Sequence, residues 1–150
     1  MGEGATGAAS GCGDGGSALD RLILDTTILI GAERQRNALD DLIGDEDDVA
    51  IAAITAAELL VGIELADVRR RRSRQQYVEA VLSTVPVEGY DLEVARAHAI
   101  LLAHAKRSGR SRGAHDLVIA ATALARSRMV VTADESGFAD LPGVLLRAPA

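Results

Sequence analysis

The chain has 150 residues, of which 48% are hydrophobic, and its 22 acidic and 16 basic residues give a formal net charge of −6. This length suits one domain with one sizeable core, and the acidic balance argues against nonspecific nucleic-acid binding through the whole surface. Cys12 is the only cysteine, which excludes an internal disulfide and a thiolate metal cluster.

Residues 1–18 are dominated by Gly, Ala and Ser, so we expect a disordered tail ahead of one folded domain over residues 19–150. The tail has no basic n-region and no apolar h-region, and no later run approaches the length of a membrane span, which predicts a cytoplasmic protein. Residues 11–16 satisfy the letters of G-x-G-x-x-G. Because no strand precedes them, we interpret this match as accidental.

An apolar run over residues 22–24 predicts a buried parallel strand that delivers Asp25 to its carboxyl end. Ligands of open α/β sheets bind at such ends, but Asp25 or Thr26 would equally suit an N-cap of the following helix. Both interpretations stay open from this stretch alone. A helical turn over 27–32, a short helix over 35–43 and a solvated acidic connection over 45–48 are expected next.

Residues 49–52 predict a second buried strand, and residues 55–72 predict a helix. Thr55 and Glu58 have capping-box spacing, yet the first turn of this helix lies near the strand ends, so Glu58 is both a capping and a catalytic candidate. Glu64, about 120° further around the helix, is a secondary candidate. Gly62 costs roughly 1 kcal/mol relative to alanine, which predicts that another backbone packs against it.

Arginines cluster at positions 69–72 and 74, where they suit phosphate contacts but are more simply a solvated helix face. Ser73 is expected to cap the next helix, in which Tyr77 would lie in the core or at an interface. Residues 84–87 predict a strand that Pro86 places at a sheet edge. A long helix over 91–106 follows, with His98 and His104 on its surface.

A polar loop over 108–113 leads to a helix over 114–124, with Asp116 in its first turn. An acid there also favours the helix dipole, so Asp116 has a purely structural interpretation as well. Residues 129–132 predict a buried strand that ends at Thr132 and Asp134, and residues 144–146 predict a last strand.

These observations place four carboxylates at one edge of the predicted sheet. Asp25 and Asp134 follow strands, while Glu58 and Asp116 begin helices, and right-handed connections bring all four to the same side. Two carboxylates about 5 Å apart repel by roughly 3 kcal/mol at an effective dielectric near 20, so the group needs a cation or protonation. Oxygen ligands favour Mg²⁺ or Mn²⁺, and such ions assist phosphodiester hydrolysis. Metal-dependent hydrolysis of phosphodiesters is the predicted chemistry.

The stretches LILDTTILI, TAAELLVGIELA, HDLVIAATAL and VTADESGF resemble, in this order, the motifs of PIN-domain proteins. The set most resembles the ribonuclease toxins of bacterial VapBC toxin–antitoxin pairs, over about residues 19–146. The resemblance implies a three-layer α/β/α fold around a central parallel sheet, a PIN-like nuclease domain over residues 19–150, and Mg²⁺ or Mn²⁺ as cofactor. It also implies RNA as substrate, a VapB-like antitoxin that blocks the site, and a homodimer.

By the same resemblance, Asp25, Glu58 and Asp116 match the three acidic metal ligands. Asp134 matches a more variable fourth acidic position, and Thr132 matches the hydroxyl residue beside it, which we expect to contribute to substrate binding.

Arg112 precedes Asp116 by four residues, and with Arg107 and Arg110 it is expected to meet RNA phosphates, or alternatively to pair with acidic neighbours. Aromatic residues make up only 2% of the chain, so extensive base stacking is not expected, and RNA selection should depend on shape and phosphate placement.

Two other classes compete with the nuclease prediction. A receiver-like phosphoacceptor domain also has an aspartate at a strand end, but it needs a lysine near its last strands, and Lys106 lies earlier. A catalytically inactive PIN-like interaction module is the other alternative, although no acidic position of the motifs is replaced.

Overall fold

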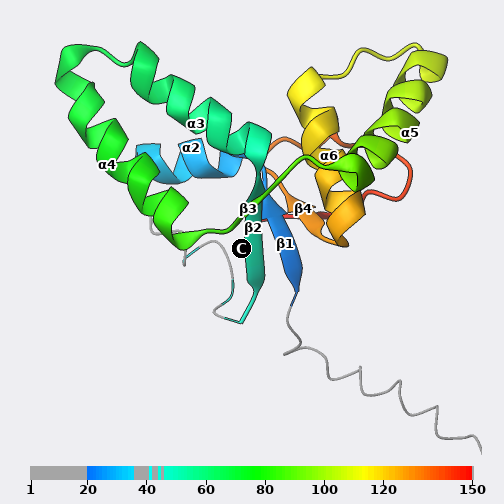
Figure 1. Ribbon diagram of the computed structural model, residues 1–150, viewed down its shortest axis with the longest axis horizontal. Helices are drawn as coiled ribbons and strands as arrows, with labels where there is room; N and C mark the ends of the chain where they lie inside the picture. Colours follow the sequence, from blue (N-terminus) through cyan, green and yellow to red (C-terminus); the bar gives the residue numbers. More distant parts are fainter. Residues whose placement is uncertain (1–19, 36–40, 42–43, 45, 150) are drawn as a thin grey trace, which may run out of the picture.

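The computed structural model describes residues 20–35, 41, 44 and 46–149 (Figure 1). The tail predicted over residues 1–18 and most of the short helix predicted over 35–43 lie outside the described residues. Within the described ranges, we find no helix with the length and apolar content needed to span a bilayer.

The centre of the molecule is a parallel sheet of five strands in the described part of the chain, in the order β3-β2-β1-β4-β5. The predicted first strand is the middle one, with Ile23 paired to Ala50 on one side and to Val130 on the other. This confirms that residues 22–24 form a buried central strand. The strand bounds are β1 Arg21–Leu24, β2 Asp48–Ala52, β3 Val87–Glu88, β4 Met129–Val131 and β5 Leu146–Arg147.

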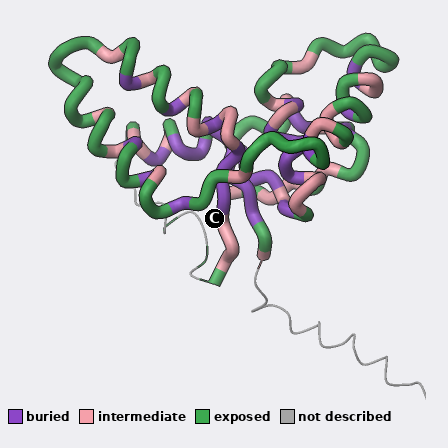
Figure 2. Tube along the Cα trace, in the orientation of Figure 1, coloured by how far each residue is buried: buried purple, intermediate pink, exposed green. Residues whose placement is uncertain are grey.

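Helices cover both faces of the sheet, which confirms the predicted three-layer α/β/α fold (Figures 1 and 2). Side chains alternate along β1, so Leu22 and Leu24 pack in one cluster with the first three helices, and Ile23 packs in the other with the last two. The helix bounds are α2 Thr26–Gln35, α3 Ala53–Leu65, α4 Val68–Thr84, α5 Leu92–Ser108 and α6 Ala114–Arg126.

The prediction of a single helix over residues 55–72 is wrong, because the helical conformation is interrupted between α3 and α4. Ala66 is extended, and the Asp67 carboxylate caps α4 by accepting a hydrogen bond from the Arg70 backbone N–H at 3.0 Å. Ser73 lies inside α4, so the predicted cap at Ser73 is also wrong. Figure 1 shows that α3 and α4 form a long antiparallel pair at one side of the molecule.

The neighbour of Gly62 is a side chain, so the predicted backbone contact is wrong. Arg74 donates to the Gly62 carbonyl at 3.3 Å and to Glu33 at 2.9 Å, which joins α4 to both α3 and α2. Tyr77 adds a second tie by donating its hydroxyl to the Leu29 carbonyl at 2.6 Å, and burial raises its pKa to about 12. Tyr77 therefore belongs to the packing between α4 and α2.

The other arginines of the 69–74 cluster are exposed, in agreement with a solvated helix face. Arg71 pairs with Glu64, whose side chain is 75% exposed. An exposed ion pair of this kind contributes little to stability. Glu64 is thus engaged on the surface of the α3–α4 pair.

Arginines and acids form a network at the amino ends of β1, β2 and β4, to which Glu88 and Arg147 also contribute from the last residues of β3 and β5, and this network was not predicted. The buried guanidinium of Arg128 donates to the Leu22 and Asp48 carbonyls at 3.1 and 2.9 Å and pairs with the carboxylates of Asp48 and Glu88. Asp47 pairs with Arg147 at 3.2 Å. The prediction that the acidic stretch at 45–48 is a purely solvated connection is therefore wrong. We call these contacts the amino-end network.

Two short strands differ from their predicted bounds. Thr84 still belongs to α4, so the strand predicted over 84–87 is shortened to β3, which follows Pro86 at the sheet edge as expected. The last strand pairs through residues 146 and 147 rather than over 144–146.

Candidate active site

The turn from β1 into α2 holds Asp25 rigidly. Its side chain is buried, with the residue only 3% exposed. One carboxylate oxygen accepts the Thr26 backbone N–H at 2.8 Å, and the other accepts the hydroxyls of Thr27 and Thr132, each at 2.8 Å. These three donors satisfy the hydrogen-bonding capacity of a side chain that is shielded from water. Asp25 therefore meets the first turn of α2, as a cap would, and still lies in the site.

Glu58 is held between two other elements, and the capping-box interpretation is wrong. Ala52 occupies the N-cap position of α3 without a side-chain cap, and Thr55 is fully buried inside the helix. One Glu58 carboxylate oxygen accepts the Thr26 hydroxyl at 2.6 Å, and the other lies 2.9 Å from His115 Nδ1. Glu58 thus links α3 to the beginnings of α2 and α6.

Asp116 lies in the first turn of α6, between two glycines that leave room for its carboxylate. A Cβ placed on Gly113 would lie 3.1 Å from Asp116 Oδ2, and one placed on Gly137 would overlap that oxygen. Burial raises the pKa of Asp116, and the negative charges of Asp25, Glu58 and Asp134 raise it further. The carboxylates are therefore close enough to repel one another.

Asp134 and Thr132 follow β4, as predicted. Asp134 is exposed, and hydrogen bonds from the Ser136 hydroxyl at 2.6 Å and backbone N–H at 3.1 Å lower its pKa. Thr132 is only 2% exposed, and its hydroxyl accepts the Asp134 backbone N–H at 3.0 Å while it lies 2.8 Å from Asp25. The buried Thr132 hydroxyl therefore connects Asp25 to Asp134.

The basic residues ahead of α6 differ in their engagement. Arg110 pairs with Asp140 at 2.9 Å, which agrees with the salt-bridge alternative. Arg112 makes one long contact, 3.5 Å from Nη1 to the Ser136 carbonyl, and its buried Nε and Nη2 have no hydrogen-bond partner among the described residues. Arg112 therefore has two N–H groups without an acceptor among the described residues, next to the loop that carries Asp134.

The donor chemistry fits a hard divalent cation that keeps part of its water shell. Among the residues that the structure describes, no three His, Cys, Asp or Glu side chains converge closely enough to hold an ion by themselves. The predicted ligands are all carboxylates, and burial together with the negative charges of the other three acids raises the pKa of Asp116. Mg²⁺ typically binds through one or two carboxylates plus water, which matches such a set.

Four residues of this site were missed by sequence reasoning: Thr26, Thr27, His115 and Gly137. The first three are adjacent or nearly adjacent in sequence to predicted acids, and that proximity was their only signal. No sequence signal pointed to Gly137, because its importance depends on where the Asp116 carboxylate lies in the folded chain.

Comparison with known proteins gives one consistent result. The family model for the PIN domain matches residues 22–144. "Ribonuclease VapC5" of Mycobacterium tuberculosis is 39% identical over 124 residues, which cover 81% of this chain and 87% of that protein. The solved VapBC-5 from the same organism is 33% identical, with a TM-score of 0.68 over 85% of this chain and 96% of that one. VapBC2 from Rickettsia felis, solved with a promoter DNA fragment, has a TM-score of 0.76 over 85% of this chain and 98% of that one; at 21% identity it supports the fold alone.

Proposed function

The chain belongs to the PIN-domain family, and from that premise we propose that it is a metal-dependent endoribonuclease and the toxin of a type II toxin–antitoxin pair. The observation that carries the proposal is that Asp25, Glu58, Asp116 and Asp134 lie near one another at the carboxyl edge of the sheet, where burial raises the pKa of Asp116 and the charges of the other three acids raise it further. The names of the curated relatives support RNA as the substrate.

In this proposal the four carboxylates hold Mg²⁺ or Mn²⁺ together with water. Such an ion, when bound, supplies the Lewis acidity that activates water and stabilises the leaving oxygen of a phosphodiester. The chain's own part is to fix Asp25 and Glu58 before the substrate arrives. Their partners Thr26, Thr27 and His115 come from the first turns of two helices, and the rigid scaffold reduces the reorganisation needed for binding.

Thr132 takes a positioning role in this scheme rather than the substrate contact expected from the sequence. Its hydroxyl is buried and lies within hydrogen-bond reach of Asp25 and Asp134, so it orients an acid and cannot easily reach RNA.

Arg112 is the proposed phosphate contact. Its buried Nε and Nη2 have no hydrogen-bond partner among the described residues, and in this proposal the side chain turns outward so that the planar guanidinium offers them to a phosphate in a bidentate arrangement. A phosphate in place of the long Ser136 contact would lie beside the acidic site, where RNA has to pass.

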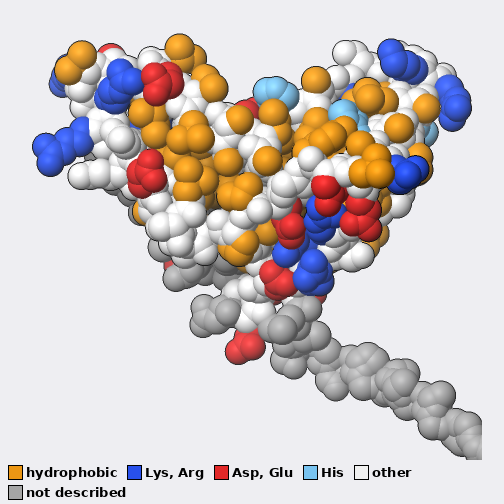
Figure 3. Space-filling view, in the orientation of Figure 1, with side chains coloured by type: hydrophobic (Ala, Val, Ile, Leu, Met, Phe, Trp, Pro, Cys, Tyr) orange, Lys and Arg blue, Asp and Glu red, His pale blue; other side chains and the backbone are white. Residues whose placement is uncertain are grey.

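A VapB-like antitoxin and a second copy of the chain are the proposed protein partners. Hydrophobic side chains gather across the face shown in Figure 3, over the α3–α4 pair and over α5. Leu65 and Val68 are 80% and 92% exposed, and Leu92 and Ile100 are 66% and 64% exposed. Large exposed apolar areas of this kind mark protein interaction sites. The solved relatives described as VapBC complexes support an antitoxin as one occupant.

The test is cleavage of total cellular RNA by purified wild type and by Asp116→Asn, with Mg²⁺, with Mn²⁺ and with EDTA. Glu64→Gln is the matched control, because Glu64 is an exposed acid that pairs with Arg71. We expect metal-dependent cleavage in wild type and Glu64→Gln and none in Asp116→Asn. Cleavage that persists in EDTA would refute the metal mechanism, and folded wild type that cuts no RNA would favour the inactive interaction module.

A further inference from the structure

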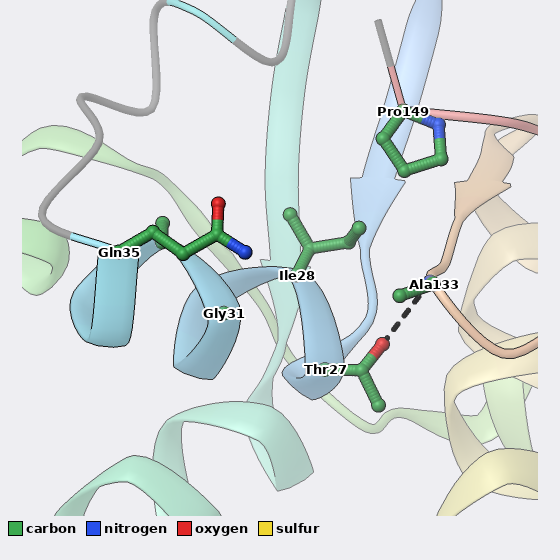
Figure 4. Close-up of a pocket in the computed structure, with 7 residues that line it drawn as sticks. Thr27, Ile28, Gly31, Gln35, Ala133 and Pro149 are labelled. Atoms are coloured by element: carbon green, nitrogen blue, oxygen red, sulfur yellow. Dashed lines mark hydrogen bonds between the residues drawn. The ribbon is translucent and has the colours of Figure 1, made fainter.

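A cavity of about 230 Å³ lies next to the acidic site and has no part in the scheme above. One wall is the face of α2 that carries Thr27, Ile28, Gly31 and Gln35, and the other is formed by Ala133 and Pro149 (Figure 4). None of the four carboxylates lines it. The cavity is therefore a separate compartment beside the metal-binding edge.

The cavity shares one residue with the scaffold of the site. Thr27 donates its hydroxyl to Asp25 at 2.8 Å and accepts the Ala133 backbone N–H at 3.2 Å, the bond drawn as a dashed line in Figure 4. The rim of the cavity is thus one side chain away from the Asp25 carboxylate. We therefore expect a substrate whose reacting phosphate lies at the acidic edge to place a neighbouring nucleotide over this cavity.

The lining has the chemistry of a site for a flat, neutral group. Among the residues that the structure describes, no charged side chain lines the cavity, and Ile28 and Pro149 supply apolar surface. The Thr27 hydroxyl and the Gln35 amide supply polar groups near its ends (Figure 4). A Cβ placed on Gly31 would meet no heavy atom within 4 Å, so the wall is open at that point. A phosphate or a charged side chain would find no counter-ion among the described lining residues, whereas a nucleobase has apolar faces and hydrogen-bonding edges.

The opposite side of the site has the opposite chemistry. A hollow of about 360 Å³ between α5 and the loop before α6 is lined by Lys106, Arg110 and Arg112. Basic groups there suit the sugar–phosphate backbone, and the uncharged cavity on the α2 side suits a base. The two hollows differ in charge, and this difference favours a different part of an RNA strand in each.

We propose that the α2 cavity is a nucleobase subsite that gives the enzyme a base preference at one position next to the cleaved phosphate. The inference rests on the proposed ribonuclease function and adds a substrate determinant to it. Its occupant is a single unstacked base of a single-stranded RNA segment, the form in which proteins usually recognise RNA sequence.

The first test measures binding without catalysis. Each of the four ribonucleosides is titrated into Asp116→Asn while the backbone amide signals are followed by NMR. We expect one or two nucleosides to shift the amides of residues 27–35 and Ala133, and Gly31→Leu, which fills the cavity, to abolish these shifts. Gly31→Ala is the matched control, because it adds only the Cβ for which the wall has room. Ala133→Leu fills the cavity from the other wall and guards against misfolding of Gly31→Leu.

The second test measures cleavage of a random-sequence RNA library. Wild type and Gly31→Ala should share a base preference at one position, and Gly31→Leu should lose it by about tenfold, the discrimination that pockets of this kind supply. An unchanged preference in Gly31→Leu and Ala133→Leu, or no amide shift with any nucleoside, overturns the subsite. Shifts caused by an antitoxin peptide alone would assign the cavity to the partner protein and also overturn it. If wild type cuts no RNA, the ribonuclease proposal fails, while nucleoside binding still decides what the cavity holds.

Discussion

Gly137→Ala should disable the site while leaving the fold intact. Gly137 ends a short 3₁₀ turn after Asp134 and lies outside the left-handed region of φ, so alanine fits its backbone. The new Cβ would lie 3.0 Å from Asp116 Cγ and would overlap Oδ2. The carboxylate is the end of a flexible side chain, so it moves away instead of disrupting the backbone.

The magnitude follows from the required displacement. Restoring an ordinary contact moves the Asp116 oxygen by roughly 1 Å, and a misplacement of that size near reacting groups costs about a hundredfold in rate. That loss corresponds to about 2.7 kcal/mol of transition-state stabilisation. Unfolding should be unaffected or slightly harder, because replacing glycine restricts the unfolded chain by about 0.4–1 kcal/mol.

The assay compares single-turnover RNA cleavage and urea unfolding for wild type, Gly137→Ala and Gly89→Ala. Gly89 is the control, because a Cβ there meets no heavy atom within 4 Å. The double variant Gly137→Ala/Asp116→Asn should be no worse than Asp116→Asn alone, since both changes act through one carboxylate. Cleavage at the wild-type rate by Gly137→Ala would refute the placement of Asp116 in the site.

Three further predictions concern charge. In EDTA, the unfolding free energy of wild type should fall relative to that of Asp116→Asn as the pH rises from 3.8 through the raised pKa of Asp116. The reason is that the folded state holds the Asp116 proton more tightly than the unfolded state. Urea unfolding across this pH range checks the sign, and a constant difference between the two proteins would contradict the prediction. His115→Ala should weaken Mn²⁺ binding by about tenfold in titration calorimetry, since partners of metal ligands typically contribute this much. His115→Asn keeps a donor for Glu58 and should lose less, so equal losses would remove the positioning role. Arg128→Met should lower the unfolding free energy by about 3 kcal/mol because it strands buried acceptors, with metal affinity of the folded fraction unchanged.

Sequence patterns predicted the layers of this fold well, because each strand is a short apolar run that alternates with a helical segment. The patterns failed at the α3–α4 boundary, where the residues on both sides favour helix and no glycine or proline marks the interruption. That boundary depends on Asp67 capping the second helix and on how the two helices pack. The amino-end network was equally out of reach, since Arg128 bonds to residues 80 and 106 positions away.

Three of the acids lie where the sequence placed them, since Asp25 and Asp134 follow strands and Asp116 lies in the first turn of α6. Glu58 was expected in the first turn of its helix but lies in the second, because α3 begins at Ala53. The supports of the acids were not predictable, because they join distant segments: Thr26 reaches Glu58 across 32 positions and His115 reaches it across 57. The start of α3 decides between cap and site for Glu58. A spacing of three residues fits both roles, and the capping box is excluded because α3 begins at Ala53, which places Thr55 inside the helix.

The amino-end network and the acidic site lie at opposite ends of the central strands. A genetic screen should therefore distinguish mutations at the two ends. Variants selected for loss of activity should fall into two groups. Changes around Arg128 and Asp48 should reduce the amount of protein in the cell, whereas changes around Asp25 and Asp116 should leave a normal amount of inert protein. Immunoblotting of each isolate would sort the two groups without any purification, and the position of a mutation along the strands would forecast the group to which it belongs.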